Sequence, residues 1–101
     1  MVFVSGQLGF EPATGKLVEG GIEAEARQTF KNIETLLNEA GSKVGDLVKV
    51  GVIIKDWADF AAMNVVYREW VASCKVLPAR TTFQAGEMPV NSRYKRDLFQ
   101  I

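Results

Sequence analysis

The side chains that could do chemistry in this chain are charged groups rather than histidine or cysteine. The sequence has no histidine and a single cysteine, Cys74, against 12 lysines and arginines and 12 aspartates and glutamates. Without histidine, the commonest general base and the commonest metal ligand are both missing. Nothing beside Cys74 marks it as an activated nucleophile, so we expect it to pack. We therefore expect no metal site and neither a metal-dependent nor a serine–histidine hydrolase.

Lysine and arginine offer the remaining chemistry, which is the binding of anions. The formal net charge is zero, whereas nucleic-acid binders usually carry a basic excess because phosphate contacts supply much of their affinity. The one basic cluster, Arg93, Lys95 and Arg96, is short and is typical of a solvated strand face. No apolar run reaches membrane-spanning length, and no basic leader precedes a hydrophobic segment. We expect a cytoplasmic protein, or a mitochondrial one if a eukaryotic leader is missing, that binds a small anionic metabolite and neither nucleic acid nor membrane.

The N-terminal half predicts a strand, a loop and a helix that would position such groups. Residues 2–10 are rich in β-branched and aromatic types, which indicates a strand. Residues 12–16 have the composition of a turn. From Ile22 to Ala40 the apolar residues recur at the spacing of one helix face. Gly41 can end this helix in the left-handed conformation.

The second half begins with a strand and another helix. Residues 47–54 form an apolar, β-rich run that predicts a buried strand. Asp56 is placed to cap a helix over residues 57–72. The apolar stripe of that helix consists of Phe60, Met63, Tyr67, Trp70 and Val71.

Two further strands complete a β-α-β-α-β-β order. Residues 80–87 and 94–101 are predicted strands on either side of a turn. Two helices covering one face of such a sheet make an α+β sandwich. We expect the apolar strand residues, among them Val50, Val52 and Ile54, to alternate between both faces. The uncovered face would then be apolar as well, and burial against other subunits would cover it.

Four segments, in order and without a shift in spacing, match the motifs of one family: residues 2–7, 12–18, 59–67 and 78–82. Together they resemble the RidA family, also called YjgF or L-PSP, and the similarity runs to about residue 89. The resemblance implies one domain over residues 1–101 with a chorismate-mutase-like fold, short at both termini relative to the family. It also implies a homotrimer whose sheets face a central barrel and whose clefts lie between subunits.

The resemblance implies an enzyme that hydrolyses reactive 2-imino or 2-enamino acids to 2-keto acids and ammonia without a cofactor. Arg80 matches the arginine of the family's Pro-Ala-Arg motif. Its bidentate fork would hold the substrate carboxylate. Without the motif, an arginine at the start of a strand is typical of a surface position.

Other residues match cleft positions of the family. Ser5 and Gly6 match residues that line the cleft, where a glycine lets backbone and ligand meet. Phe60 and Asn64 match cleft-facing helix positions and share one helix face, being four residues apart. Thr82 matches a position beside the site. Each also has a plain interpretation: a Ser-Gly bulge, a core phenylalanine and a strand threonine.

The C-terminal part departs from the family at the position of the water-activating group. Lys95 stands fifteen residues after Arg80, where deaminating members carry a glutamate. A lysine cannot activate the water unless its pKa falls by several units. Asp97 lies two residues further on, on the same strand face, and matches a second acidic position of the family that is not catalytic there. We take Arg80 and Asp97 as the catalytic candidates, and Lys95 as a candidate for substrate binding.

Three functions remain open on the sequence alone. The first is an imine deaminase of the RidA type. The second is a non-catalytic trimer in which Arg80 and Lys95 form a cationic pocket for a small carboxylate, such as a 2-keto acid. The third is a ribonuclease or translation inhibitor, an activity also attached to this family. Zero net charge, the lack of histidine and the lack of a basic-aromatic platform argue against the third.

Overall fold

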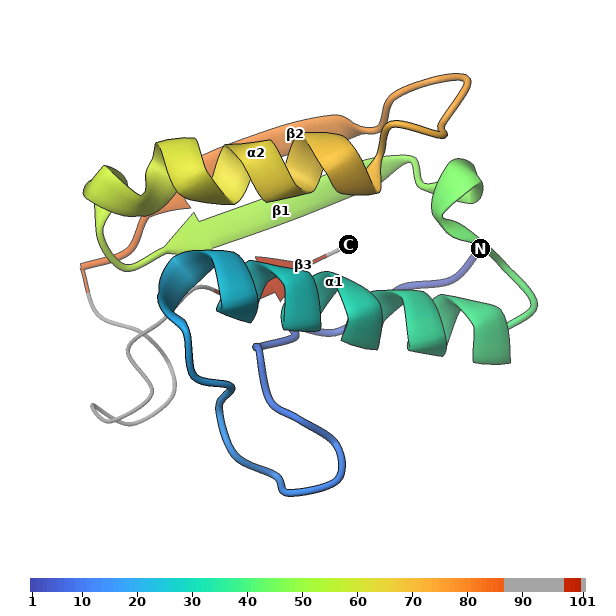
Figure 1. Cartoon of the computed structure of the whole chain (residues 1–101). Helices are drawn as coiled ribbons and strands as arrows, with labels where there is room; N and C mark the ends of the chain where they lie inside the picture. The colour runs from blue at the N-terminus through green and yellow to red at the C-terminus, as the bar shows by residue number, and fades with distance from the viewer. Residues whose placement is uncertain (87–97, 101) are drawn as a thin grey trace.

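The computed structural model describes residues 1–86 and the backbone of residues 98–100. Two α-helices, α1 (Gly21–Glu39) and α2 (Phe60–Trp70), lie side by side on one face of a small sheet (Figure 1). The sheet contains β1 (Lys49–Ile54), β2 (Ala79–Gln84) and β3 (Leu98–Gln100). The α+β class expected from the sequence is therefore confirmed.

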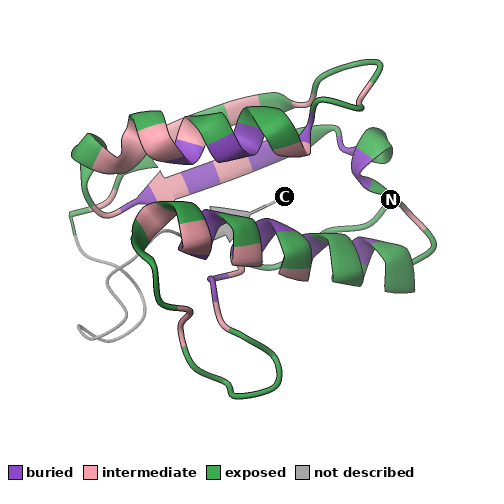
Figure 2. Ribbon diagram, in the orientation of Figure 1, coloured by how far each residue is buried: buried purple, intermediate pink, exposed green. Residues whose placement is uncertain are grey.

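Helix α1 forms where the apolar spacing predicted it, within a residue at each end. Four of its apolar residues are at most 3% exposed: Ala26, Phe30, Ile33 and Leu37. Gly41 follows the helix with φ of 79°, the left-handed conformation that glycine adopts without strain. The buried stripe faces the sheet, and the opposite side of the helix is exposed (Figure 2).

Strand β1 is the centre of the sheet, in the order β2-β1-β3. It runs parallel to β2, with Val50 opposite Arg80 and Val52 opposite Thr82. It runs antiparallel to β3, with Val52 opposite Phe99. Parallel neighbours require a crossover connection, and α2 supplies it between β1 and β2. This connection places α2 over the strand that carries Arg80.

The distribution of apolar residues over the two sheet faces differs from the expectation. Val50, Val52 and Ile54 are each 0% exposed and all point toward the helices, because residues two apart in a strand share a face. The prediction that they alternate between faces was wrong. The face away from the helices carries Ile53 and, opposite it on β2, Phe83.

The start of α2 is a tighter turn than predicted. Asp56 does act as a cap, because its carboxylate accepts a hydrogen bond from the Ala58 amide at 3.0 Å. It caps a 3₁₀ turn, Trp57–Asp59, and the α-helix itself begins at Phe60. The Trp57 amide donates to Oε1 of Gln84 at 2.9 Å, which ties this turn to the end of β2.

Residues 2–10 do not form the predicted strand. They contain only isolated bridges, one of which joins Phe10 and Leu17. The side chain of Asn32 on α1 donates to the carbonyls of Leu8 (3.2 Å) and Phe10 (2.8 Å), which ties this segment to the helix. Gly9 packs so tightly that an added Cβ would lie 2.8 Å from the Glu25 carbonyl oxygen.

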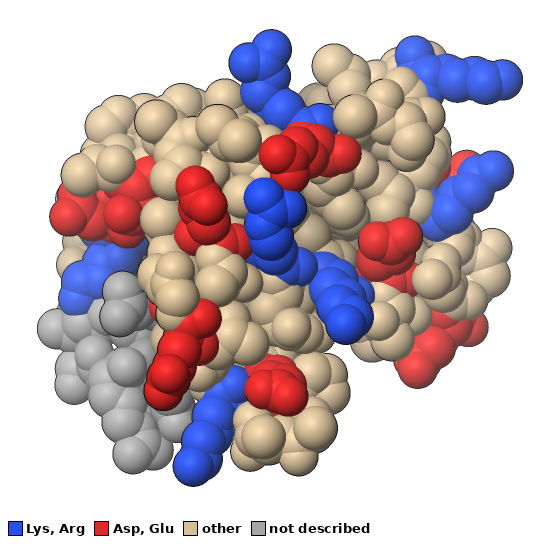
Figure 3. All heavy atoms as spheres, viewed as in Figure 1, with Lys and Arg blue, Asp and Glu red and all other residues tan. Residues whose placement is uncertain are grey.

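The two C-terminal strands are shorter in the described residues than predicted. Strand β2 ends at Gln84, and the described part of the final strand is Leu98–Gln100. The predicted turn over residues 88–92 and the rest of the final strand lie outside the described residues. Within the part of the chain that the structure describes, no helix has the length and apolarity needed to span a membrane. Lysines, arginines and acidic residues interleave on the face shown in Figure 3.

Candidate functional site

Arg80 lies near the start of β2 with its guanidinium against α2. Its Nη1 donates a hydrogen bond to Oδ1 of Asn64 at 2.6 Å. Its Cζ lies 4.5 Å from the centre of the Tyr67 ring and 5.7 Å from the centre of the Phe60 ring. Both distances fall within the range of cation–π contacts. The strand therefore supplies the cation, and the helix supplies every described contact to it.

The spacing of α2 explains why these three residues meet one arginine. Asn64 follows Phe60 by four residues and precedes Tyr67 by three, so all three lie on one face of the helix. That face looks onto β2 because α2 is the crossover between β1 and β2. The structure thus brings together Arg80, Phe60 and Asn64, which the sequence proposed for one site.

Tyr67 is a contact that the sequence analysis assigned only to the apolar stripe. The residue is 6% exposed, and its hydroxyl is buried without a hydrogen-bond partner among the described residues. Burial raises the pKa of this hydroxyl above its ordinary value of 10.0, although the charge of Arg80 acts in the opposite direction. Its spacing of three from Asn64 was the signal that could have placed it in the site.

The described neighbours of Arg80 carry no negative charge that would pair with its guanidinium. Asn64 and Phe60 have no ionisable group. Burial raises the pKa of the Tyr67 hydroxyl, so this side chain is neutral as well. Among the described residues, no carboxylate forms a salt bridge with Arg80. The guanidinium has several N–H donors in one plane, and the bond to Asn64 engages Nη1. This arrangement can bind a planar anion such as a carboxylate.

Thr82 shares the face of β2 on which Arg80 lies, two residues further along the strand. Its hydroxyl oxygen is buried and has no hydrogen-bond partner among the described residues. The opposing residue, Val52, offers no polar group. The structure therefore places Thr82 two residues from Arg80 on the same strand face, and its role in the site stays a prediction.

The remaining predicted residues are not brought to Arg80 by the described structure. Ser5 and Gly6 are exposed in the N-terminal segment, where the Ser5 carbonyl accepts a bond from the Gln7 side chain at 3.1 Å. Lys95 and Asp97 lie outside the described residues. Their roles remain predictions.

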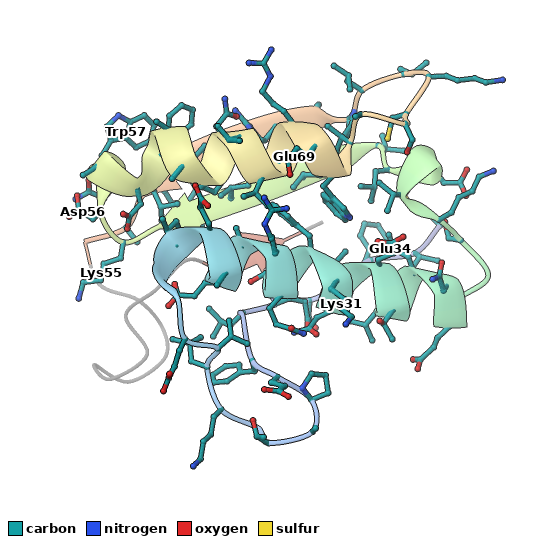
Figure 4. The ribbon with its side chains drawn as sticks, in the orientation of Figure 1. Lys31, Glu34, Lys55, Asp56, Trp57 and Glu69 are labelled. Carbon is teal, nitrogen blue, oxygen red and sulfur yellow. The ribbon has the colours of Figure 1, made fainter. Side chains whose placement is uncertain are left out.

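An aromatic surface continues from the arginine toward the start of α2. The ring of Phe60 stacks on that of Trp57, with centres 4.7 Å apart and planes 12° apart. Trp57 is 49% exposed and lies at the end of the molecule where α2 begins (Figure 4). The cation of Arg80 is thus flanked by an apolar wall that reaches solvent.

A separate groove lies between the two helices and contains none of the predicted site residues. Lys31 and Glu34 extend from α1 and Glu69 from α2 (Figure 4). The ion pair between Arg27 and Glu69, at 2.9 Å, bridges the helices beside it. The groove is lined by Arg27, Phe30, Lys31, Glu34, Val66, Glu69 and Trp70. In the described part of the chain, no group of three potential metal ligands comes together.

Comparison with known proteins agrees with the motifs and the fold. A family model described as Endoribonuclease L-PSP matches residues 1–94. The chain is 40% identical over 100 residues to the 2-iminobutanoate/2-iminopropanoate deaminase of Capra hircus, covering 99% of this chain and 72% of that protein. It is 38% identical over 100 residues to a RutC family protein of Aquifex aeolicus, covering 99% of this chain and 79% of that one. The crystal structure of E. coli TdcF with bound serine superposes with a TM-score of 0.86 at 29% identity, covering 97% of this chain and 75% of that one. The chain therefore belongs to the L-PSP family, also called the RidA or YjgF family.

Proposed function

We propose that this protein hydrolyses 2-imino acids, and the 2-enamino acids that tautomerise to them, to 2-keto acids and ammonia. Water adds to the carbon of the C=N bond, and the carbon–nitrogen bond then breaks. The water oxygen becomes the keto oxygen, and the nitrogen leaves as ammonia. The reaction is a hydrolysis that neither oxidises nor reduces the substrate, so it needs no redox cofactor.

The observation that carries this proposal is the uncharged cradle around Arg80. Every substrate of this class has a carboxylate next to the reacting carbon. A guanidinium whose described contacts are an amide oxygen and two aromatic rings retains the charge and the N–H groups that bind a carboxylate bidentately. Such binding would fix the C=N carbon at a set distance from the protein, which is the positioning that catalysis requires. The deaminase names of relatives at about 40% identity support the same reaction.

The remaining parts of the site would come from a trimer with clefts between subunits. Ser5 and Gly6 do not meet Arg80 within the described part of one chain. In the proposed trimer they would line the cleft of a neighbouring subunit, where the backbone of Gly6 can approach the ligand closely. Thr82 would offer its unpartnered hydroxyl to the substrate or to the attacking water.

Activation of the water needs a proton acceptor, and no described carboxylate lies in contact with Arg80. We assign this role to Asp97, with Lys95 as a second cation for the substrate. General acid–base catalysis typically contributes about 10²–10⁴ in rate. A chain without a well-placed carboxylate would therefore be a slow deaminase.

The same features support a second function, a trimer that binds small carboxylates without catalysis. Arg80 with its uncharged cradle supports carboxylate binding, and the resemblance places Lys95 where deaminating members carry a glutamate. Ribonuclease activity occurs in the name of the family model. The zero net charge gives it no support.

The test is ammonia release from freshly generated 2-iminobutanoate, measured above the spontaneous rate. Arg80→Ala should lose most of the activity, and Arg80→Lys should retain little of it because lysine lacks the planar fork. Arg27→Ala is the matched control, because Arg27 is an exposed arginine that pairs with Glu69 in the interhelical groove. It should behave like the wild type.

Binding of 2-ketobutyrate, measured by calorimetry on the same proteins, separates the two functions. A charge-assisted contact contributes about 1.5–3 kcal/mol, so Arg80→Ala should weaken binding by about tenfold or more. If the wild type binds 2-ketobutyrate through Arg80 but releases no ammonia, the binding function is correct. If neither activity nor binding depends on Arg80, the proposed site is wrong.

A further inference from the structure

The Arg80 guanidinium lies over the ring of Tyr67, which is the nearer of its two aromatic contacts. The distance from Cζ to the ring centre is 4.5 Å, against 5.7 Å for Phe60. Cation–π attraction fades at about 6 Å, so Tyr67 makes the main contact. The bond from Nη1 to Asn64 holds one edge of the guanidinium. A single hydrogen bond from one nitrogen still allows the group to rotate about that bond, whereas a ring packed against the group restricts the rotation.

Tyr67 is itself held firmly enough to orient another group. Its ring meets Phe30 edge-on at 6.0 Å between centres and Trp70 edge-on at 6.4 Å. Phe30 and Trp70 are in turn stacked at 4.5 Å. The ring that faces Arg80 is therefore part of a packed aromatic cluster joining α1 and α2.

We propose that Tyr67 is a positioning residue, whose ring sets the plane of the Arg80 guanidinium before a substrate carboxylate arrives. The inference rests on the proposed function for its catalytic consequence but not for its structural content. A fork that is already oriented loses less conformational freedom when it binds, which increases affinity. The neutral state of the phenol fits this role, because a neutral ring holds the cation without neutralising its charge.

The hydroxyl of Tyr67 plays no part in this orientation. It is buried without a partner among the described residues, and the contact to Arg80 is made through the ring face. Tyr67→Phe keeps the ring and removes only the hydroxyl, whereas Tyr67→Leu removes the ring. Leu37→Ala, at a 3% exposed position on α1, is the control for a general loss of packing.

Side-chain NMR of Arg80 tests the positioning without any substrate. The ¹⁵Nε–H order parameter of Arg80 should be high in the wild type, Tyr67→Phe and Leu37→Ala, and should fall clearly in Tyr67→Leu. If the Arg80 side chain moves as freely in the wild type as in Tyr67→Leu, the inference is wrong whatever the activity. If Leu37→Ala loosens it as much as Tyr67→Leu does, general packing rather than Tyr67 orients the arginine.

Kinetics with 2-iminobutanoate test the consequence. The KM of Tyr67→Leu should rise by about tenfold, the upper part of the range for a partly buried cation–π contact, with kcat within about twofold of the wild type. Tyr67→Phe should match the wild type, and an equal loss in both variants would contradict a role for the ring. A wild type that neither deaminates nor binds 2-ketobutyrate would overturn the proposed function, and the NMR result would still decide the role of Tyr67.

Discussion

A guanidinium that contacts an amide oxygen and aromatic rings has no carboxylate among these groups to pair with its charge. For Arg80 these groups come from a single helix face, and the hydrogen bond from Nη1 to the amide oxygen of Asn64 is short at 2.6 Å. A carboxylate in place of Asn64 would have neutralised the arginine and removed its affinity for an anion. The choice of an amide at this position is therefore as informative about function as the arginine itself.

The ionisation of Tyr67 should affect stability at high pH. Burial raises the pKa of its hydroxyl above 10.0 in the folded protein. Above pH 10 the unfolded chain therefore releases the proton first, and the folded state loses stability as the pH rises further. The free energy of unfolding of the wild type should fall relative to that of Tyr67→Phe between pH 8.5 and 10.5, measured by urea denaturation. A constant difference over this range would show that the hydroxyl is not perturbed.

The position of the proton acceptor can be tested at residues 95 and 97. If a carboxylate is needed where Lys95 stands, Lys95→Glu should raise kcat toward the ~10²–10⁴ that general acid–base catalysis supplies, with little change in KM. Lys95→Gln, which removes the charge without adding a carboxylate, should not. If Asp97→Asn abolishes activity while Lys95→Glu changes nothing, Asp97 is the base already in place.

At the scale of elements, α2 determines the site because it is the crossover that returns the chain to β2. The sequence predicted both helices from the spacing of their apolar residues and the strands β1 and β2 from their composition, because both signals are local. Phe60 and Asn64 could be placed beside Arg80 by the family motif. Tyr67 was missed because an aromatic residue in a helix stripe has the same pattern whether it packs only on the core or also on a cation.

The wrong prediction for residues 2–10 has a different physical cause. Strand composition shows that a segment prefers an extended backbone, but a strand also needs a partner for its hydrogen bonds. Here the side chain of Asn32 donates hydrogen bonds to the carbonyls of Leu8 and Phe10. A long-range hydrogen bond from one helix side chain produces no periodic pattern in the sequence, so it could not be predicted.

The attachment of the N-terminal segment to α1 should depend on Asn32. Asn32→Ala removes the two hydrogen bonds to this segment and the one that Asn32 accepts from Gln28. Each bond to the segment is worth about 0.5–1.5 kcal/mol, so losing the two should lower the free energy of unfolding by about 1–3 kcal/mol in urea denaturation. Amide hydrogen exchange in residues 2–10 should accelerate. Asn38→Ala, at an exposed position on the same helix, controls for helix propensity. Equal stability of the two variants would show that Asn32 does not hold the segment.

At the scale of the molecule, both helices lie on one face of the sheet, and no helix among the described residues covers the other face (Figure 1). Ile53 and Phe83 face each other across β1 and β2 on that side, and Phe83 is 49% exposed. Neighbouring exposed apolar side chains on a sheet face are typical of a surface that another subunit covers. The interhelical side, by contrast, carries charges of both signs.

We expect a homotrimer that buries this sheet face, so sedimentation equilibrium at micromolar concentration should give three chains. Phe83→Asp places a charge where the subunits would meet, and a charge buried without a partner is strongly unfavourable. The variant should therefore sediment as a monomer and, because the proposed cleft lies between subunits, lose its ammonia-releasing activity while Arg80 and α2 stay intact. Val65→Asp is the matched control: Val65 is 53% exposed on α2, so this substitution should leave both the mass and the activity unchanged. A monomeric wild type would exclude the shared cleft. A trimeric Phe83→Asp would place the subunit contact on another surface.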